Sequence, residues 1–139
     1  MRQTIISIVI FMIFVCASYA QEKPEPAKQQ HEMPGVAVKE VDAFHELLHP
    51  LVHEAYPAKD FAAIKKGLPG LVDAAVSMKK ASLPPKFAAK KNLYKKHSKK
   101  LHQQLTSMNK MKSKLTDDEL GKRFMEMHDT FESIMGLMN

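Results

Sequence analysis

Histidines spaced four residues apart are the feature of this sequence with the clearest chemical potential. His45, His49 and His53 follow one another at that spacing, and a four-residue step places side chains on one flank of an α-helix. Neutral imidazole is the commonest protein ligand for transition metals, and it titrates near physiological pH. The pattern therefore predicts a metal or haem site, although it does not identify the metal.

Two further histidines, His97 and His128, lie near the middle of later segments that are expected to be helical. At a rise of ~1.5 Å per residue, four antiparallel helices bring both to within about one turn of the level of His45 and His49. Glu132 follows His128 by one helical turn and could bind a metal or orient the imidazole. We therefore expect these five side chains to form a site in the middle of the molecule.

Copper, zinc and nickel are the metals expected at such a site. A lone inward histidine is more often a satisfied core residue than a ligand, so the prediction depends on four imidazoles meeting at one level. Taken alone, His53 and His102 are expected to face solvent. Thioethers combined with imidazoles suit copper, particularly Cu(I), but methionines also fill cores. The methionines concerned are Met108, Met111, Met125, Met127, Met135 and Met138.

Residues 1–20 have the features of a cleaved signal peptide. Arg2 precedes an apolar run from Ile5 to Cys16, and Ala17–Ala20 supplies small residues before a cleavage site. The run is short for a membrane span of ~20 residues. Cleavage would remove Cys16, the only cysteine, and with it any disulfide, thiolate ligand or covalent haem attachment. We expect a periplasmic or secreted protein.

The rest of the chain is expected to be a short tether followed by one helical domain. Residues 21–35 are polar and contain three prolines, which is typical of a flexible tether. Residues 36–139 carry an apolar period of 3.6 residues, and no stretch alternates as a strand does. The period predicts helices over about residues 37–56, 60–83, 85–112 and 116–138. The expected fold class is all-α, an antiparallel up-down-up-down four-helix bundle.

Apolar residues at the helical period are expected to form the core. They are Val41, Phe44, Leu48, Leu51, Val52, Ala55, Phe61, Ile64, Leu68, Leu71, Val72, Ala75, Met78, Phe87, Tyr94, Leu101, Leu105, Met108, Leu120, Phe124, Met127, Phe131, Ile134, Met135 and Met138. Pro50 should kink the first helix, because it removes the hydrogen bond to the Glu46 carbonyl. Gly67 and the Pro69–Gly70 pair should break or bend the second helix.

Two helix starts can be recognised from their capping residues. Asp60 is expected to cap the second helix, because a carboxylate there accepts from an amide of the first turn. Thr116 and Glu119 have the spacing of a capping box at the start of the fourth helix. Both signals support the expected helix boundaries.

Lysines crowd the third helical segment, where no acidic residue occurs between Ser82 and Leu115. A solvated helix face would account for them. An acidic protein or an anionic envelope surface bound by Lys91, Lys95 and Lys99 would also account for them. Nucleic acid is not expected as a partner of an exported protein, and a homodimer remains open.

An exported four-helix chain with an inward histidine on its last helix, His128, resembles the cytochrome b562 and cytochrome c′ group. That resemblance implies haem iron bound by His128, with His45 or His97 on the opposite side. The chain departs from the group because it lacks a Cys-x-x-Cys-His sequence and has no methionine at the start of the first helix. Covalent haem is thereby excluded, whereas non-covalent haem stays open.

Three functions remain after these considerations. The leading one is an exported bundle that stores, buffers or senses a transition metal. The alternatives are electron transfer through non-covalent haem, and a metal-free envelope interaction or chaperone protein that uses the lysine-rich face. An enzyme is not expected, because no pairing of a nucleophile with a base is evident.

Overall fold

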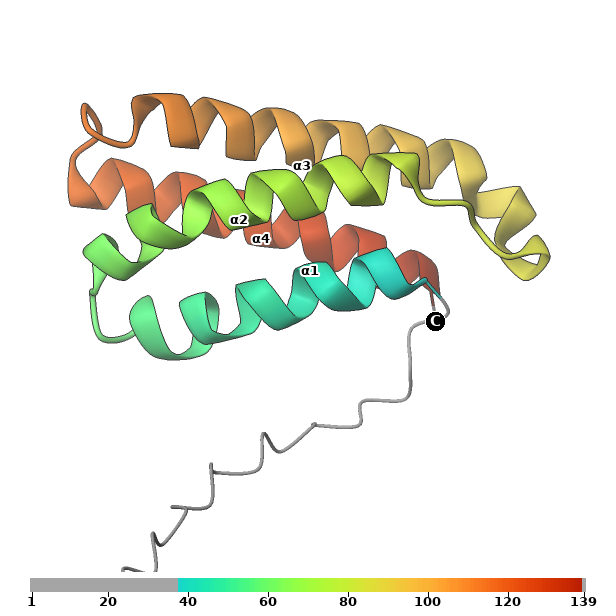
Figure 1. The fold of residues 1–139 in the computed structure, drawn as a ribbon, viewed down its shortest axis with the longest axis horizontal. Coiled ribbons are helices and arrows are strands. Elements are labelled where there is room, and N and C mark those ends of the chain that lie inside the picture. The colour runs from blue at the N-terminus through green and yellow to red at the C-terminus, as the bar shows by residue number, and fades with distance from the viewer. Residues whose placement is uncertain (1–37, 139) are drawn as a thin grey trace, which may run out of the picture. The chain divides into compact units, whose positions relative to one another are not determined.

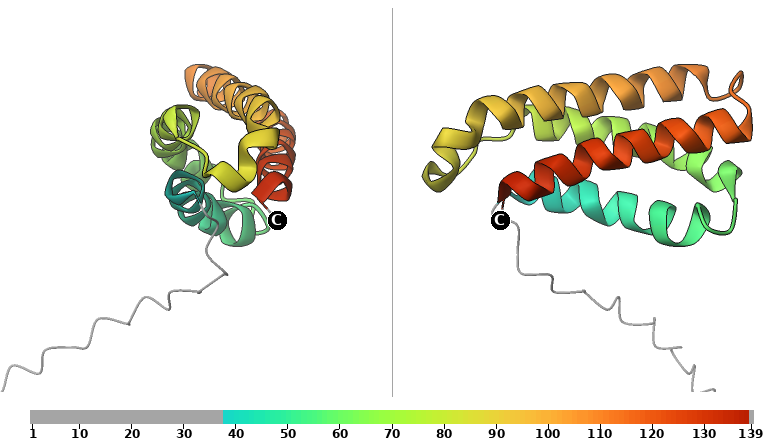
Figure 2. Two further views of the ribbon diagram at one scale, coloured as in Figure 1. Left: turned by 90° about the vertical axis from the view of Figure 1, so that its right-hand side faces the viewer. Right: turned by 180° about the vertical axis from the view of Figure 1, so that it is seen from behind.

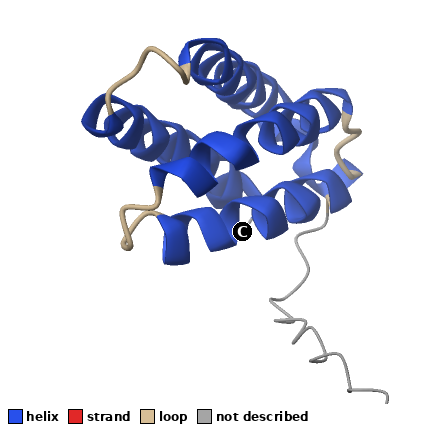
Figure 3. Ribbon diagram, turned by 60° about the vertical axis from the view of Figure 1, so that its left-hand side comes forward, coloured by secondary structure: helices blue, strands red, loops and turns tan. Residues whose placement is uncertain are grey.

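The described part of the chain, residues 38–138 of a computed structural model, is helical throughout its regular structure (Figure 3). The predicted all-α fold class is confirmed. The predicted signal peptide, residues 1–20, and tether, residues 21–35, lie outside the described residues. Among the described helices, none is both long enough and apolar enough to cross a membrane.

Four long helices and two short helical turns make up this region. They are α1 (Lys39–Pro50), the π-helical turn η1 (Leu51–Ala55), α2 (Phe61–Lys80), the 3-10 turn η2 (Pro85–Lys90), α3 (Lys91–Met111) and α4 (Asp117–Met138). Consecutive helices pack side by side, α1 with α2, α2 with α3 and α3 with α4 (Figure 1). Seen end-on and from behind, α4 also lies between α3 and α1 (Figure 2). The four helices therefore surround a common interior.

The interior is apolar, and its residues are largely those predicted from the helical period. Of the expected core residues, only Leu51, Phe61, Val72 and Met135 are half-buried, and the others are buried. The Tyr94 hydroxyl lies in the core and donates to the Met78 carbonyl at 2.8 Å. Burial, together with the nearby Glu40 carboxylate, raises the pKa of Tyr94 to about 12. The hydroxyl therefore stays protonated and keeps this bond at neutral pH.

The chain widens into a π-helical turn directly after Pro50. Proline has no amide hydrogen, so it cannot donate to the Glu46 carbonyl. The Tyr56 amide then donates to the Leu51 carbonyl at 2.9 Å, five residues back. A turn of this kind inside a helix is rare and frequently occurs at functional sites. The main consequence for the candidate site is that His53 lies within this turn.

Gly67 and the Pro69–Gly70 pair were expected to break or bend the second helix; they do not break it, because α2 is one helix from Phe61 to Lys80. Pro69 leaves the Lys65 carbonyl without its helical partner. The Lys112 ammonium group lies 3.5 Å from that carbonyl and donates to it. A Cβ atom at Gly67 would lie only 2.6 Å from Leu51 Cδ1. A Cβ atom there would force the Leu51 side chain to shift, so glycine allows Leu51 of η1 to pack closely against α2.

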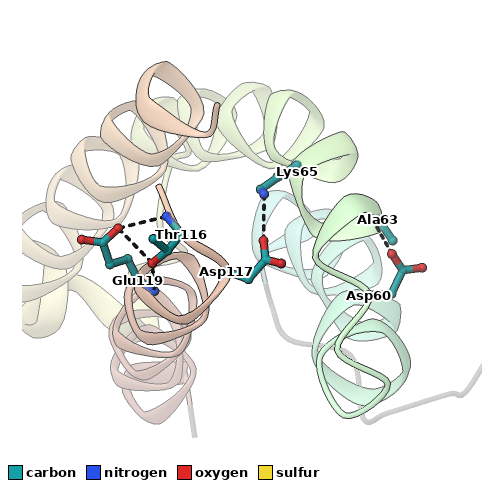
Figure 4. Close-up of polar contacts among 6 residues, drawn as sticks. All are labelled: Asp60, Ala63, Lys65, Thr116, Asp117 and Glu119. Carbon is teal, nitrogen blue, oxygen red and sulfur yellow. Dashed lines mark hydrogen bonds and ion pairs between the residues drawn. The ribbon is translucent and has the colours of Figure 1, made fainter. Parts of the chain in front are cut away.

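Both predicted helix caps are confirmed at one end of the molecule (Figure 4). The Asp60 carboxylate accepts from the Ala63 amide at 2.9 Å. The Thr116 amide donates to Glu119 at 2.9 Å, and the Glu119 amide donates to the Thr116 hydroxyl at 3.2 Å. These bonds satisfy amides that the helix itself cannot satisfy. The caps fix the residue at which α2 and α4 each begin. They therefore also fix the position of every side chain along the axes of these two helices.

Candidate functional site

None of the six histidines in residues 38–138 is buried in the apolar interior. His45, His97, His102 and His128 are half-buried, whereas His49 and His53 are exposed. The space between α1 and α4 is occupied instead by Phe44 and Phe131, whose ring centroids lie 4.9 Å apart. The histidines therefore lie along the grooves between helices and do not converge in the centre.

The three histidines of α1 and η1 form a continuous row of rings. The ring centroids of His45 and His49 lie 5.7 Å apart, and those of His49 and His53 lie 4.4 Å apart. An ordinary α-helix rotates such a row gradually around its axis. The π-helical turn has more residues per turn and keeps His53 beside His49. His53 is exposed, as expected, but it remains part of the row.

Residues of α4 lie opposite this row because α1 and α4 pack in antiparallel register. The ring of Phe131 stacks on His45 with centroids 5.8 Å apart, and the ring of Phe124 stacks on Tyr56 at 6.2 Å. One contact lies near the start of the row and the other lies beyond its end. Counting residues along both helices between these two contacts, we infer that His128 lies near the level of His49.

Glu132 completes a set of four polar side chains along this groove. Its carboxylate lies 3.6 Å from His128 Nε2, and it is close enough to His45 to act on the pKa of that imidazole. His45 and Glu132 thus lie at one level, and His49 and His128 lie at the next. We call His45, His49, His128 and Glu132 the α1–α4 site.

The electrostatic environment keeps His45 in the form that binds metals. Burial lowers the pKa of His45 below its ordinary value of 6.5, and the neighbouring His49 lowers it further. The carboxylate of Glu132 acts in the opposite direction. A lowered pKa means that the imidazole is neutral at pH 7 and has a free lone pair.

The side chains of the α1–α4 site are not clustered around a single point. Over residues 38–138, no three His, Cys, Asp or Glu side chains are grouped closely enough to hold a metal ion. His49 is exposed, and the Glu132 side chain is 59% exposed, so both can change rotamer without disturbing the core. Each helix supplies two donors, His45 and His49 on α1 and His128 and Glu132 on α4. Their side chains would have to rotate toward one another to bind a metal ion together.

The structure separates His97 from the other predicted ligands. His97 lines an open groove of about 340 Å³ between α3 and α4, with Glu126, Asp129 and Ser133 on the α4 side. Those residues lie on a different face of α4 from His128 and Glu132. Sequence periodicity placed His97 at the right level, but the level alone does not decide which neighbour a side chain faces.

The lysines predicted to bind a partner, Lys91, Lys95 and Lys99, are exposed on α3. The large apolar side chain of Leu93, on the same helix, is also exposed, at 49%. These lysines lie at four-residue steps along one helix, as expected for a solvated face or for a surface that meets an anionic partner.

The expectation that the protein is not an enzyme overlooked one motif at the α1–α4 site. His45 is followed directly by Glu46, and His49 completes the pattern His-Glu-x-x-His. On a helix, this pattern places two imidazoles on one side for zinc and a glutamate beside them as a general base. Glu46 is exposed on α1. The motif supports a metal at His45 and His49, and it reopens the question of catalysis.

Comparison with protein families, with curated proteins and with solved structures gave no match.

Proposed function

We propose that this protein is an exported, antiparallel four-helix bundle that binds a transition metal ion at the α1–α4 site. Copper, zinc and nickel are the metals that suit its ligands, and the role is storage, buffering or sensing. Export follows from the signal peptide expected in residues 1–20. The observation that carries the proposal is the position of Glu132 on α4, which lies close enough to His45 of α1 to act on its pKa and 3.6 Å from His128 Nε2.

The chemistry of this donor set supports a metal ion. Two histidines one helical turn apart form a recurrent metal-binding pair. The opposite helix supplies a third imidazole and a carboxylate, the two ligand types found beside histidine in zinc sites. The lowered pKa of His45 adds to this, because a metal binds only the neutral imidazole.

The packing around the site favours a small ion over haem. His45 stacks on Phe131, and Phe131 in turn packs against Phe44. These rings occupy the space beside His45 that a haem macrocycle would need. A metal ion requires only that the exposed ends of the side chains rotate toward one another.

Replacing His49 and His128 together by glutamine is expected to abolish stoichiometric binding of zinc or copper. The His49 substitution removes a donor from α1, and the His128 substitution removes one from α4. Affinity is expected to fall at least about a hundredfold, because changing a residue that only contacts a ligand already weakens metal binding by 10–100-fold. The measurement is calorimetric or chelator-competition titration of the purified chain.

Two other histidines provide matched controls for that double variant. His102→Gln and His97→Gln each remove one half-buried imidazole from α3, away from the α1–α4 site. Both are expected to bind metal as the wild type does. Retained binding in the double variant, or its loss in His97→Gln alone, would show that the metal site lies elsewhere.

Zinc-dependent hydrolysis is a second candidate function, favoured by the motif His45-Glu46-Leu47-Leu48-His49. In such motifs the metal lowers the pKa of a bound water, and the glutamate accepts its proton. If the site hydrolyses peptides or esters, Glu46→Gln is expected to remove that activity while zinc affinity stays unchanged. Equal rates for wild type and variant on a peptide or ester panel would exclude catalysis by Glu46 and leave binding as the function.

A further inference from the structure

The groove between α1 and α4 continues past the α1–α4 site toward the π-helical turn. On the α1 side the next ring is His53, 4.4 Å from His49 between centroids. On the α4 side, Met125 precedes His128 by three residues, so it lies on the same stripe of that helix. The two side chains thus extend the row of donors by one level.

The register of α4 against η1 locates Met125 at the level of His53. Gly121, one turn before Met125, packs on Tyr56, because a Cβ atom built there would lie 3.4 Å from the tyrosine ring. His128 lies near the level of His49. On α4, Met125 lies between Gly121 and His128. On the opposite side, His53 lies between Tyr56 and His49, so we place Met125 near the level of His53.

Met125 shares a stripe of α4 with His128 and is not enclosed in the core. The side chain packs against the core but is only half-buried, so part of it is open to solvent. Methionine at an entirely buried position, such as Met127 on the same helix, could act only as core. The difference in burial distinguishes Met125 from the methionines that fill the interior.

We infer that His49, His53 and Met125 form a soft end of the groove that takes Cu(I). Thioether sulfur is a soft ligand that selects Cu(I), and imidazole accepts copper in either oxidation state. The harder end, with Glu132, suits divalent ions. This inference rests on the proposed function and deepens it, because it names copper as the metal and assigns a second type of ligand to the same groove.

The test compares Cu(I) and Zn(II) affinities in Met125→Leu and His53→Gln variants. All variants are made in the exported chain that begins at Gln21 after the expected cleavage, which has no cysteine to compete for Cu(I). Cu(I) affinity is measured anaerobically, with ascorbate, by competition with bicinchoninate, and Zn(II) affinity by competition with a chromophoric chelator. Both variants are expected to weaken Cu(I) binding at least about tenfold and to leave Zn(II) binding unchanged.

Leucine replaces methionine with little change in volume, so Met125→Leu is expected to fold. Met135→Leu is the matched control, because Met135 is also half-buried on α4 but lies beyond Glu132, away from the soft end. X-ray absorption of the Cu(I)-loaded chain should show a sulfur neighbour that Met125→Leu removes and Met135→Leu retains.

The possible failures are distinguishable from one another. Unchanged Cu(I) affinity in Met125→Leu, or an equal loss in Met135→Leu, overturns the inference and leaves the proposed function standing. A chain that binds zinc but no Cu(I) also overturns the inference and leaves the proposed function standing. A chain that binds neither metal overturns both proposals.

Discussion

Replacing Phe131 by alanine is expected to lower the free energy of unfolding by about 3–5 kcal/mol, the usual effect of truncating a buried phenylalanine. Phe131 is fully buried, and its ring packs on both Phe44 and His45. Domains of this size have total stabilities of roughly 5–15 kcal/mol, so the loss would be a large fraction. Chemical denaturation with urea, followed by circular dichroism, measures it.

Leu93→Ala is the control for this truncation, because Leu93 is a large apolar residue that is 49% exposed. Its substitution is expected to change stability by less than about 0.5 kcal/mol. The milder variant Phe131→Leu should fold and expose His45 to water. Because burial is the main cause of the lowered His45 pKa, NMR titration of Phe131→Leu should show that pKa moving up toward its ordinary value. No stability difference between Phe131→Ala and Leu93→Ala would contradict the packing described between α1 and α4.

Stability is expected to fall with pH below about 6.5, and metal-dependent stabilisation should disappear over the same range. His45 has a lowered pKa in the folded chain, so the unfolded state binds its proton more readily. The stabilisation due to neutral His45 is therefore complete above the ordinary pKa and is lost as pH falls through 6.5 toward the lowered value. Protons also compete with the metal for every imidazole of the site.

The size of the metal effect can be stated for a given concentration. At a free metal concentration one hundred times the Kd, a single site stabilises the folded state by about 2.7 kcal/mol. Thermal melts at pH 7.5 should show this gain with added zinc, and melts at pH 5 should show almost none. His45→Gln is expected to flatten the pH dependence of the metal-free protein. A metal-induced gain that persists unchanged at pH 5 would argue against imidazole ligands.

Local features of the fold follow from the sequence where neighbouring residues alone decide them. The Asp60 cap and the Thr116–Glu119 capping box depend on residues three apart, and both form as expected. Burial of most predicted core residues follows from the apolar period, because a helix can bury only one side.

Long-range contacts account for the features that the sequence did not predict. Gly67 and the Pro69–Gly70 pair were expected to break or bend the second helix, but α2 does not break, and the Lys112 ammonium group donates to the carbonyl that Pro69 leaves free. Gly67 allows Leu51 to pack closely against α2. Lys112 and Leu51 are distant from α2 in sequence, so local propensity gives no indication of either compensation.

For the candidate site too, some features follow from the sequence alone and others depend on the tertiary structure. Spacing by itself determined that His45 and His49 share one flank of a helix, that His128 and Glu132 share another, and that the fold is all-α, because these depend only on helical geometry. Only the tertiary structure decided which of these flanks face each other. In the structure Glu132 of α4 lies close enough to His45 to act on its pKa and 3.6 Å from His128 Nε2, whereas His97 lines a different groove, between α3 and α4. The physical reason is that a helix fixes the angles among its own side chains, whereas its orientation toward its neighbours is set by how the apolar faces of all four helices pack together.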